Sequence, residues 1–182
     1  MTETKKESLS QGLVQVYTGN GKGKSTAAFG LALRAVGCGM HVVIIQFMKI
    51  KGCYAEEQAF QRLTPELEHY AYGTKHWVKK GQGSPEDYAM AKAAMAKALE
   101  CITDPDKDVV ILDEINNAIY FELVSVEDVL ALLQQKLPTI EVVLTGRNAP
   151  QELLDAADLV TEMREVKHYY QKGVQSRKGI EY

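Results

Sequence analysis

The sequence lacks the features that mark disulfide-bonded, zinc-binding, membrane-spanning and secreted proteins. Its 182 residues include three cysteines, which are widely spaced and form no C-x-x-C pair, and this excludes a disulfide framework and a zinc site of paired cysteines. No apolar run approaches the roughly 20 residues of a membrane-spanning helix, and the polar opening MTETKKESLS lacks the apolar core of a secretory signal. We therefore expect free thiols in a reducing compartment, no membrane contact and a cytoplasmic location.

An excess of basic residues is missing as well. The net charge of -3 argues against nucleic acid as the main partner, because nucleic-acid binding usually leaves a basic footprint. The chain also has no internal repeat and no low-complexity segment. Its hydrophobic fraction of 46% and charged fraction of 25% are ordinary for a globular protein. We predict a single domain over 1–182, with a flexible polar segment at 1–11.

Short runs rich in Val and Ile alternate with helical patterns along the chain. Such runs are typical of strands buried on both faces, so the order predicts an α/β fold: a mostly parallel sheet of five to six strands with helices on both faces. The expected strands are Leu13–Tyr17, His41–Phe47, Leu67–Tyr72, Asp108–Asp113, Ile140–Thr145 and Leu159–Met163. The expected helices are Ser25–Val36, one from Ser84 to about Cys101, one from Ser125 to about Leu137, and Pro150–Ala157.

Ligands of parallel sheets bind outside the carboxyl ends of the strands. The segments that follow the expected strands, 18–25, 47–54, 73–83, 113–120 and 145–149, are therefore the predicted sites of chemistry.

The first of these segments is rich in glycine and lysine. Gly19-Asn20-Gly21-Lys22-Gly23-Lys24-Ser25 follows a strand and opens a helix, which is the context of a phosphate-binding loop. Glycines let backbone N–H groups surround phosphate oxygens, and the helix N-terminus adds donors. Lys24 supplies a cation and the Ser25 hydroxyl a ligand for Mg²⁺. Thr18 stands where the usual spacing has glycine, and the alternative is a glycine-rich turn that binds nothing.

A second nucleotide signal is an acidic pair at a strand end. Val109–Leu112 is followed by Asp113 and Glu114, which places two carboxylates close to the loop in this fold class. There they can hold Mg²⁺, or Mn²⁺, beside the phosphates. Taken alone the pair could be a solvated strand end; together with the loop it predicts binding of a nucleoside triphosphate with its metal.

Five stretches along nearly the whole chain carry a family resemblance. They are TGNGKGKSTAAFGLALRAVG at 18–37, QFMK at 46–49, LDEINNA at 112–118, LTGRNAP at 144–150 and MREVKHYYQKGVQSRKGIEY at 163–182. These stretches resemble the phosphate-loop ATP:corrinoid adenosyltransferases, which have a RecA-like fold. The resemblance implies transfer of the 5′-deoxyadenosyl group of ATP to Co(I) of a reduced corrinoid, with release of tripolyphosphate and formation of adenosylcobalamin. It also implies an electron-donating flavoprotein reductase and a homodimer.

The resemblance extends to individual residues. Co(I) is itself the nucleophile, so no side-chain nucleophile is required, and the implied catalytic residues are Lys22 and Lys24, which stabilise the leaving triphosphate. ATP in this family is reversed, with its γ-phosphate deepest and C5′ toward the corrinoid. By this resemblance the phosphates are bound by Gly19, Asn20, Gly21, Lys22, Gly23, Lys24 and Ser25, the nucleotide is assisted by Arg34, and the metal is held by Ser25 and Glu114. Their positions in the sequence add Thr26 and Arg147 as candidates for ATP and Asp113 as a candidate for the metal. For Arg147, the alternative is an ordinary loop turn.

One stretch departs from the family pattern. Where the family has G-F-T-W, whose aromatics form part of the corrinoid face, this chain has Gly73-Thr74-Lys75-His76-Trp77, one residue longer and without the Phe. By resemblance Trp77 contacts the corrinoid, although tryptophan is also often buried in a core. His76 lies close enough in sequence to approach cobalt, but a bound imidazole would oppose four-coordinate Co(II).

Other polar residues carry weaker signals. His41 and His69 begin or lie in strands and are expected to be structural. Asn116 and Asn117 follow the acidic pair and are candidates for contacts with ribose or corrinoid amides. The basic tail beyond Met163 is either a solvated segment or a wall at the nucleotide end of the site.

Two other functions remain open on the residues alone. A phosphate-loop kinase or ATPase would use the same loop, and a nucleotide- or corrinoid-binding module would use it without turnover.

Overall fold

The computed structural model describes residues 9–182, so the first eight residues of the predicted flexible segment lie outside the described part of the chain. Its centre is a six-stranded sheet with the order β3-β2-β4-β5-β1-β6, in which every neighbouring pair is parallel. The strands are β1 (Val14–Thr18), β2 (Val42–Phe47), β3 (Leu67–Tyr72), β4 (Val109–Asp113), β5 (Glu141–Thr145) and β6 (Leu159–Glu162). Each begins and ends within one residue of its predicted position.

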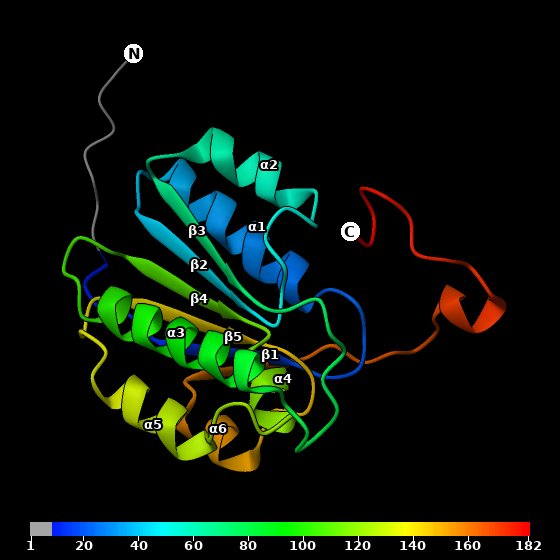
Figure 1. The fold of residues 1–182 in the computed structure, drawn as a ribbon. Helices are drawn as coiled ribbons and strands as arrows, with labels where there is room; N and C mark the ends of the chain where they lie inside the picture. Colours follow the sequence, from blue (N-terminus) through cyan, green and yellow to red (C-terminus); the bar gives the residue numbers. More distant parts are fainter. Residues whose placement is uncertain (1–8) are drawn as a thin grey trace.

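Helices cover both faces of this sheet, as predicted (Figure 1). One face carries α1 (Lys24–Gly37) and α2 (Glu56–Phe60), and the opposite face carries α3 (Pro85–Ile102), α4 (Ile115–Tyr120), α5 (Val126–Gln134) and α6 (Gln151–Ala156). Two short 3-10 helices, Gln61–Leu63 and Tyr169–Lys172, complete the described elements. Among the described residues, no helix has the length and apolarity to span a membrane.

Strand β2 shows that the sheet is buried on both faces. All six of its residues are buried, and they alternate between two apolar clusters. Val42 and Ile44 pack with the alanines of α1, whereas Val43, Ile45 and Phe47 pack with residues of α3, α4, α5 and α6. A strand buried on both faces needs an apolar residue at nearly every position, which is the continuous run seen in the sequence.

The larger differences between the predicted and the observed elements are in the helices. The predicted start of α3 is confirmed, with a capping box between Ser84 and Asp87. Helix α5 ends at Gln134, earlier than the predicted Leu137, because Leu137 donates its amide to the carbonyl of Ile102 (3.0 Å) and leaves the helical ladder. Helices α2 and α4 were not predicted, since five or six residues are too few to show a helical period.

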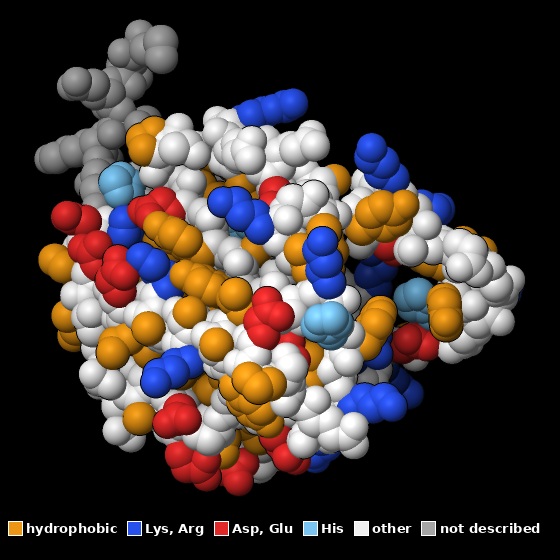
Figure 2. Space-filling view, in the orientation of Figure 1, with side chains coloured by type: hydrophobic (Ala, Val, Ile, Leu, Met, Phe, Trp, Pro, Cys, Tyr) orange, Lys and Arg blue, Asp and Glu red, His pale blue; other side chains and the backbone are white. Residues whose placement is uncertain are grey.

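The chain beyond β6 forms an extended arm, residues 163–182. It leaves the end of β6, carries the short helix Tyr169–Lys172 and turns back toward the side of the domain that bears α1 and α2 (Figure 1). In the space-filling view, the arm and the body of the domain border a hollow in which basic side chains are visible (Figure 2). The arm therefore encloses one side of the region beyond the strand ends.

Candidate active site

Two adjoining cavities lie beyond the carboxyl ends of the strands. The larger, about 610 Å³, is bordered by the loop after β1, and we call it the phosphate-loop cavity. The smaller, about 360 Å³, is bordered by the segment after β3, and we call it the aromatic cavity. All five segments predicted to carry chemistry, 18–25, 47–54, 73–83, 113–120 and 145–149, contribute residues to these walls.

The phosphate loop is folded tightly against the start of the arm. Gly19 and Gly23 have φ angles of +93° and +126°, a region that favours glycine. A Cβ on Gly21 would lie 2.7 Å from the carbonyl oxygen of Met163, and the Gly21 amide donates to that same oxygen at 2.6 Å. The glycines therefore let the end of β6 and the start of the arm approach the loop closely.

The unusual Thr18 also has a structural use. Its hydroxyl accepts a hydrogen bond from the amide of Ala149 at 3.3 Å, so it connects the end of β1 to the loop after β5. The replacement of glycine at this position thus leaves the loop intact and adds an anchor for the segment that carries Arg147.

The two lysines of the loop are in different environments. Lys24 is buried and donates to the carbonyls of Gly19 (2.8 Å) and Gly21 (2.7 Å). Burial, followed by the nearby Arg147 guanidinium, lowers its pKa. Lys22 is more exposed and donates to the carbonyl of Ile180 in the arm at 2.8 Å. Lys24 is therefore part of the loop, and Lys22 links the loop to the arm.

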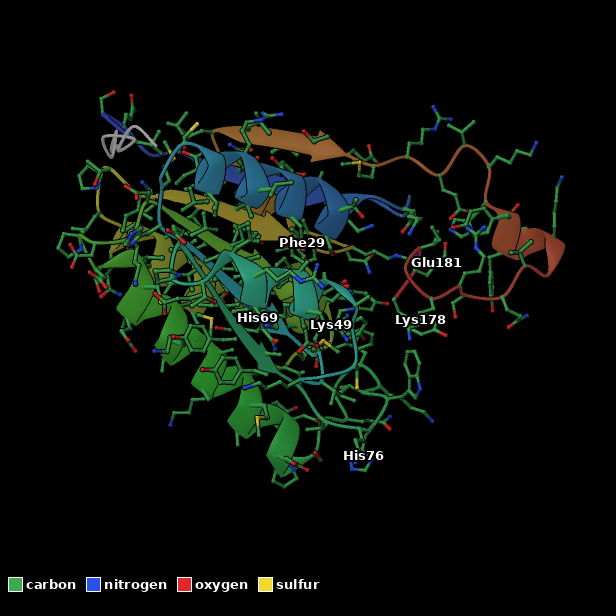
Figure 3. The ribbon with its side chains drawn as sticks, turned by 90° about the horizontal axis from the view of Figure 1, so that it is seen from above. Phe29, Lys49, His69, His76, Lys178 and Glu181 are labelled. Atoms are coloured by element: carbon green, nitrogen blue, oxygen red, sulfur yellow. The ribbon has the colours of Figure 1, made fainter. Side chains whose placement is uncertain are left out.

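The end of the arm forms a wall of this cavity. Figure 3 shows Lys178 and Glu181 of the arm facing the side of the domain that carries Phe29 and Lys49. Hydrogen bonds from Arg177 and then Tyr169 lower the pKa of Glu181 to about 2, so this carboxylate stays charged and holds the arm in a closed turn. The tail was expected to be either a solvated segment or a wall of the site, and the structure favours the second, since its last four residues line the cavity.

Asp113 lies within a chain of hydrogen-bonded polar groups that crosses four strands. It accepts hydrogen bonds from Gln46 of β2 (2.9 Å) and from the hydroxyl of Thr145 of β5 (2.7 Å). The other side of the Gln46 amide contacts Nε2 of His69 in β3 at 2.7 Å. His69 is thus structural, as predicted, and burial lowers its pKa. The two hydrogen bonds fix both Asp113 oxygens at the floor of the cavity.

Glu114 is held in a conformation that points its carboxylate into the cavity. Its backbone is left-handed (φ 65°, ψ 15°), and its amide donates to the Thr145 hydroxyl at 2.9 Å. Asn117 donates a hydrogen bond to the carboxylate and accepts one from the amide of Arg147 (2.8 Å). Burial and the adjacent Asp113 raise the pKa of Glu114, while the charges of Lys49, Lys24 and Arg147 oppose that rise.

The donor set fits Mg²⁺ that is bound together with phosphates. Ser25 and Glu114 line the same cavity. Within the described residues there is no group of three or more His, Cys, Asp or Glu side chains able to hold a metal by itself. Mg²⁺ is usually bound through one or two carboxylates together with phosphates and water, rather than by an all-protein cage. One carboxylate and one hydroxyl in the lining of the same cavity match that pattern.

The aromatic cavity is built around the segment that departs from the family pattern. Thr74 donates a hydrogen bond to the carboxylate of Asp87, which also caps helix α3, so the base of the loop is held in place. His76 and Trp77 line the cavity farther along the loop. The side chain of Trp77 is 98% exposed, so the alternative that it packs in the core is wrong.

Several predicted residues lie away from the cavities or have other partners. Arg34 is exposed in the last turn of α1, at the opposite end of the helix from Lys24, and Asn20 is an exposed residue of the loop that does not line the cavity. Thr26 and Arg147 do line it. Asn116 is fully buried and donates a hydrogen bond to the carbonyl of Gly146 (3.2 Å), and it lines neither cavity, whereas Asn117 borders both.

Two residues of the site were not singled out from the sequence. Lys49 follows β2, and its ammonium lies 4.3 Å from the centre of the Tyr54 ring; both residues border both cavities. The QFMK stretch at 46–49 was the available signal, but neither charge nor spacing distinguished Lys49 from surface lysines.

These features together define a phosphate-loop nucleotide-binding α/β protein. A six-stranded parallel sheet places a glycine-rich loop, a helix N-terminus, the Lys24-Ser25 pair and a strand-end carboxylate around one cavity. A structural comparison agrees: the flagellar accessory protein FlaH from Methanocaldococcus jannaschii superposes with a TM-score of 0.58 at 16% identity, over 85% of this chain and 72% of that one. At this identity the likeness shows the fold alone.

Sequence comparison is more specific. The family model of ATP:corrinoid adenosyltransferase BtuR/CobO/CobP matches residues 10–182, and the chain belongs to this family. It is similar to the corrinoid adenosyltransferase of Pseudomonas aeruginosa (39% identity, 94% of this chain and 84% of the relative). It is also similar to corrinoid adenosyltransferase CobA of Salmonella typhimurium (36% identity, 94% and 86%). The family and the enzyme class predicted from the sequence are confirmed.

Proposed function

We propose that this protein transfers the 5′-deoxyadenosyl group of ATP to Co(I) of a reduced corrinoid, releasing tripolyphosphate and forming adenosylcobalamin. The observation that carries the proposal is the pair of adjoining cavities: one is lined by a phosphate loop, the other by apolar and aromatic side chains, and the two share a border. An enzyme that joins a nucleotide carbon to a large corrinoid needs both spaces and an opening between them. An ATPase has no need of the second.

Within this proposal the phosphate-loop cavity orients ATP and stabilises its leaving group. The loop amides from Gly19 to Ser25 and the ammonium groups of Lys22 and Lys24 bind the phosphates, with ATP reversed so that C5′ faces the aromatic cavity. Ser25 and Glu114 would hold Mg²⁺ or Mn²⁺, with Asp113 behind them, and the metal would neutralise phosphate charge. Thr26, Asn20, Arg147 and Arg34 remain proposed contacts of the nucleotide. No side-chain nucleophile is needed, since Co(I) has the lone pair that forms the new bond.

The aromatic cavity would receive the corrinoid. Trp77 and His76 are proposed to contact it, and the exposure of Trp77 supports this because an exposed indole is available to a ligand. An aromatic ring against the lower face of cobalt excludes an axial ligand and favours four-coordinate Co(II), which is more easily reduced to Co(I).

Three further proposals concern the surroundings of the reaction. A flavoprotein reductase would supply the electron that converts Co(II) to Co(I), and the unpaired thiols of Cys38, Cys53 and Cys101 support a reducing cytoplasm. A homodimer is supported by the exposed apolar residues Leu159 and Val160 on the edge strand β6.

One experiment separates the proposed function from its alternatives. The protein is incubated with ATP, Mg²⁺ and chemically reduced cobalamin, the absorbance change of cobalt–carbon bond formation is followed, and the inorganic product is identified. The proposal predicts the absorbance change together with tripolyphosphate. ADP would indicate a kinase, orthophosphate an ATPase, and bound ligands without turnover a binding module.

A further inference from the structure

The border between the two cavities is made of four residues. Lys49, Tyr54, Glu114 and Asn117 line both the phosphate-loop cavity and the aromatic cavity. Lys49 is the cation of this set. Of these two cavities, Lys22 and Lys24 line the phosphate-loop cavity and not the aromatic cavity, and they donate to carbonyls of the arm and of the loop.

The backbone around Lys49 is built to hold it at this border. Met48 has a φ of +57°, in the left-handed region, and donates its amide to the carbonyl of Tyr72 at 2.8 Å. A Cβ on Gly73 would lie 2.5 Å from the backbone nitrogen of Lys49, so the ends of β2 and β3 are pressed together there. The chain therefore turns sharply one residue before Lys49.

The segment after Lys49 is held as well. The buried carboxylate of Glu57 accepts hydrogen bonds from the amides of Gly52 (2.7 Å) and Tyr54 (3.3 Å), which closes the turn at 52–54. The turn places the Tyr54 ring 4.3 Å from the Lys49 ammonium. An aromatic face stabilises a cation at this distance, so Lys49 is confined by a ring on one side and the strand end on the other.

The charge of Lys49 is secure at neutral pH. Burial favours loss of the proton, but the neighbouring carboxylate of Glu114, the Tyr54 side chain and Asp113 together outweigh burial and raise the pKa of Lys49. A protonated amine thus stands where the contents of the two cavities meet.

The proposed reaction breaks a bond at this border. The lone pair of Co(I) forms the Co–C5′ bond, the C5′–O5′ bond breaks, and its electron pair goes to the oxygen that leaves with the triphosphate. Cobalt is formally oxidised to Co(III), the adenosyl carbon is reduced, and no proton is transferred. Because C5′ must reach the corrinoid while the phosphates stay in the loop, the breaking bond spans the two cavities, and negative charge develops on its oxygen.

We infer that Lys49 is a catalytic residue whose ammonium stabilises the charge that develops on the oxygen leaving C5′; the inference rests on the proposed function. A fixed cation placed where charge appears in the transition state lowers the barrier without further reorganisation. Lys22 and Lys24 bind the phosphates farther from the bond that breaks. The loop lysines Lys22 and Lys24 therefore bind the phosphates, and Lys49 stabilises the oxygen that leaves C5′.

A purely structural role for Lys49 makes a different prediction. In that case the lysine would only neutralise Glu114, and its loss would weaken binding of Mg²⁺ and ATP while leaving the rate at saturation close to that of the parent. The two roles are therefore separated by measuring binding and rate independently.

The test uses Lys49→Met and Lys49→Arg in the full chain, with Lys51→Met as the control, because Lys51 is exposed and lies only two positions away. Single-turnover rates of cobalt–carbon bond formation are measured from chemically prepared Co(I) at saturating ATP and Mg²⁺, and the dissociation constant of ATP is measured by calorimetry. We expect Lys49→Met to lower the rate about a hundredfold with the ATP dissociation constant changed less than about threefold. Lys49→Arg should recover part of the rate, and Lys51→Met should match the parent.

Two results for the Lys49 variants would overturn the inference. Both can be told apart from a failure of the proposed function, which would show in the parent protein. A Lys49→Met rate at saturation within about threefold of the parent removes the catalytic role. A loss that appears at limiting Mg²⁺ and disappears at saturating Mg²⁺ assigns Lys49 to neutralising Glu114. If the parent protein itself forms no cobalt–carbon bond, it is the proposed function that fails.

Discussion

The two cavities of this protein are built in opposite ways. In the phosphate-loop cavity, charged side chains are held by hydrogen bonds close to the strand ends: Lys24 by the loop carbonyls and the Glu114 carboxylate by Asn117. The backbone amide of Glu114 is held by the Thr145 hydroxyl. In the aromatic cavity, His76 and Trp77 are exposed on a long connection without helix or strand. Chemistry that handles a small, highly charged group needs fixed donors, whereas a large planar ligand needs a surface that is available to it.

The difference extends to how each region is anchored. The polar chain from His69 through Gln46 and Asp113 to Thr145 crosses the sheet and ties the acidic pair to four strands. The loop of the aromatic cavity is tied at its base, where Thr74 meets Asp87, and Trp77 lies beyond that tie. We therefore expect substitutions in the phosphate-loop cavity to change turnover and metal binding. Substitutions in the aromatic cavity should change how readily Co(II) is reduced to Co(I).

The largest expected effect is at Lys24. Lys24→Ala should lower turnover at saturating ATP by about a thousandfold, since it removes a fixed cation from the leaving triphosphate. The thermal midpoint should stay within about 3 °C of the parent, because the ammonium donates to loop carbonyls and supports no core packing. Lys92→Ala, an exposed lysine of α3, is the control. A variant that keeps most of its turnover would remove Lys24 from leaving-group stabilisation.

A smaller effect is expected at the carboxylate. Glu114→Gln should raise the Mg²⁺ concentration needed for half-maximal activity by about thirtyfold, because a neutral amide is a poor ligand for this ion. Glu122→Gln is a matched control, since Glu122 also has a left-handed backbone (φ 62°) but pairs with Lys80 away from the cavity. The check is a metal titration of activity. Coinciding curves for Glu114→Gln and the parent would show that the metal assignment is wrong.

In the aromatic cavity we expect a selective effect. Trp77→Ala should lower the reaction that starts from Co(II) about tenfold more than the reaction that starts from chemically prepared Co(I), an energy difference of roughly 1.4 kcal/mol. Stability should not change, because the indole is 98% exposed. Leu33→Ala, another exposed apolar residue, is the control. Equal losses in both assays, with ATP binding preserved, would mean that Trp77 does not tune cobalt.

The smallest effect concerns the pH dependence of stability. Burial lowers the pKa of His69 in the folded protein, against the opposing charges of Glu57 and Asp113 and with the help of Lys51. Below the unfolded pKa of about 6.5 the unfolded chain binds the proton more readily, so this residue makes stability fall as pH falls from about 7 toward the folded pKa. His69→Gln keeps a donor for Gln46 and should flatten that fall.

The measurement is urea unfolding of parent and His69→Gln at several pH values between about 7 and 5, with His41→Gln as a second histidine variant. If the stability of the parent and of His69→Gln changes in the same way with pH, His69 does not titrate in this range.

Much of this molecule was predictable because its signals are local. The strands were recognised from continuous runs of Val and Ile, and α3 from its Ser-Pro start, since burial on two faces and end capping each require particular residue types. The short α2 and α4 were missed because their helical conformation depends on packing and on the turn at Glu114. Lys49 was missed because its role depends on the approach of β2 and β3 at Gly73.

The sheet, the phosphate loop, the acidic strand end and the family could be predicted from the amino-acid sequence, because each is a pattern of neighbouring residues. Which groups meet in the site depends on how the whole chain folds. The tertiary structure joined Asp113 to Gln46 and Thr145, brought the arm against Lys22, exposed Trp77 and placed Lys49 at the border of two cavities. These contacts join segments far apart in the chain, and their geometry follows from the close packing of strand ends, which no local pattern encodes.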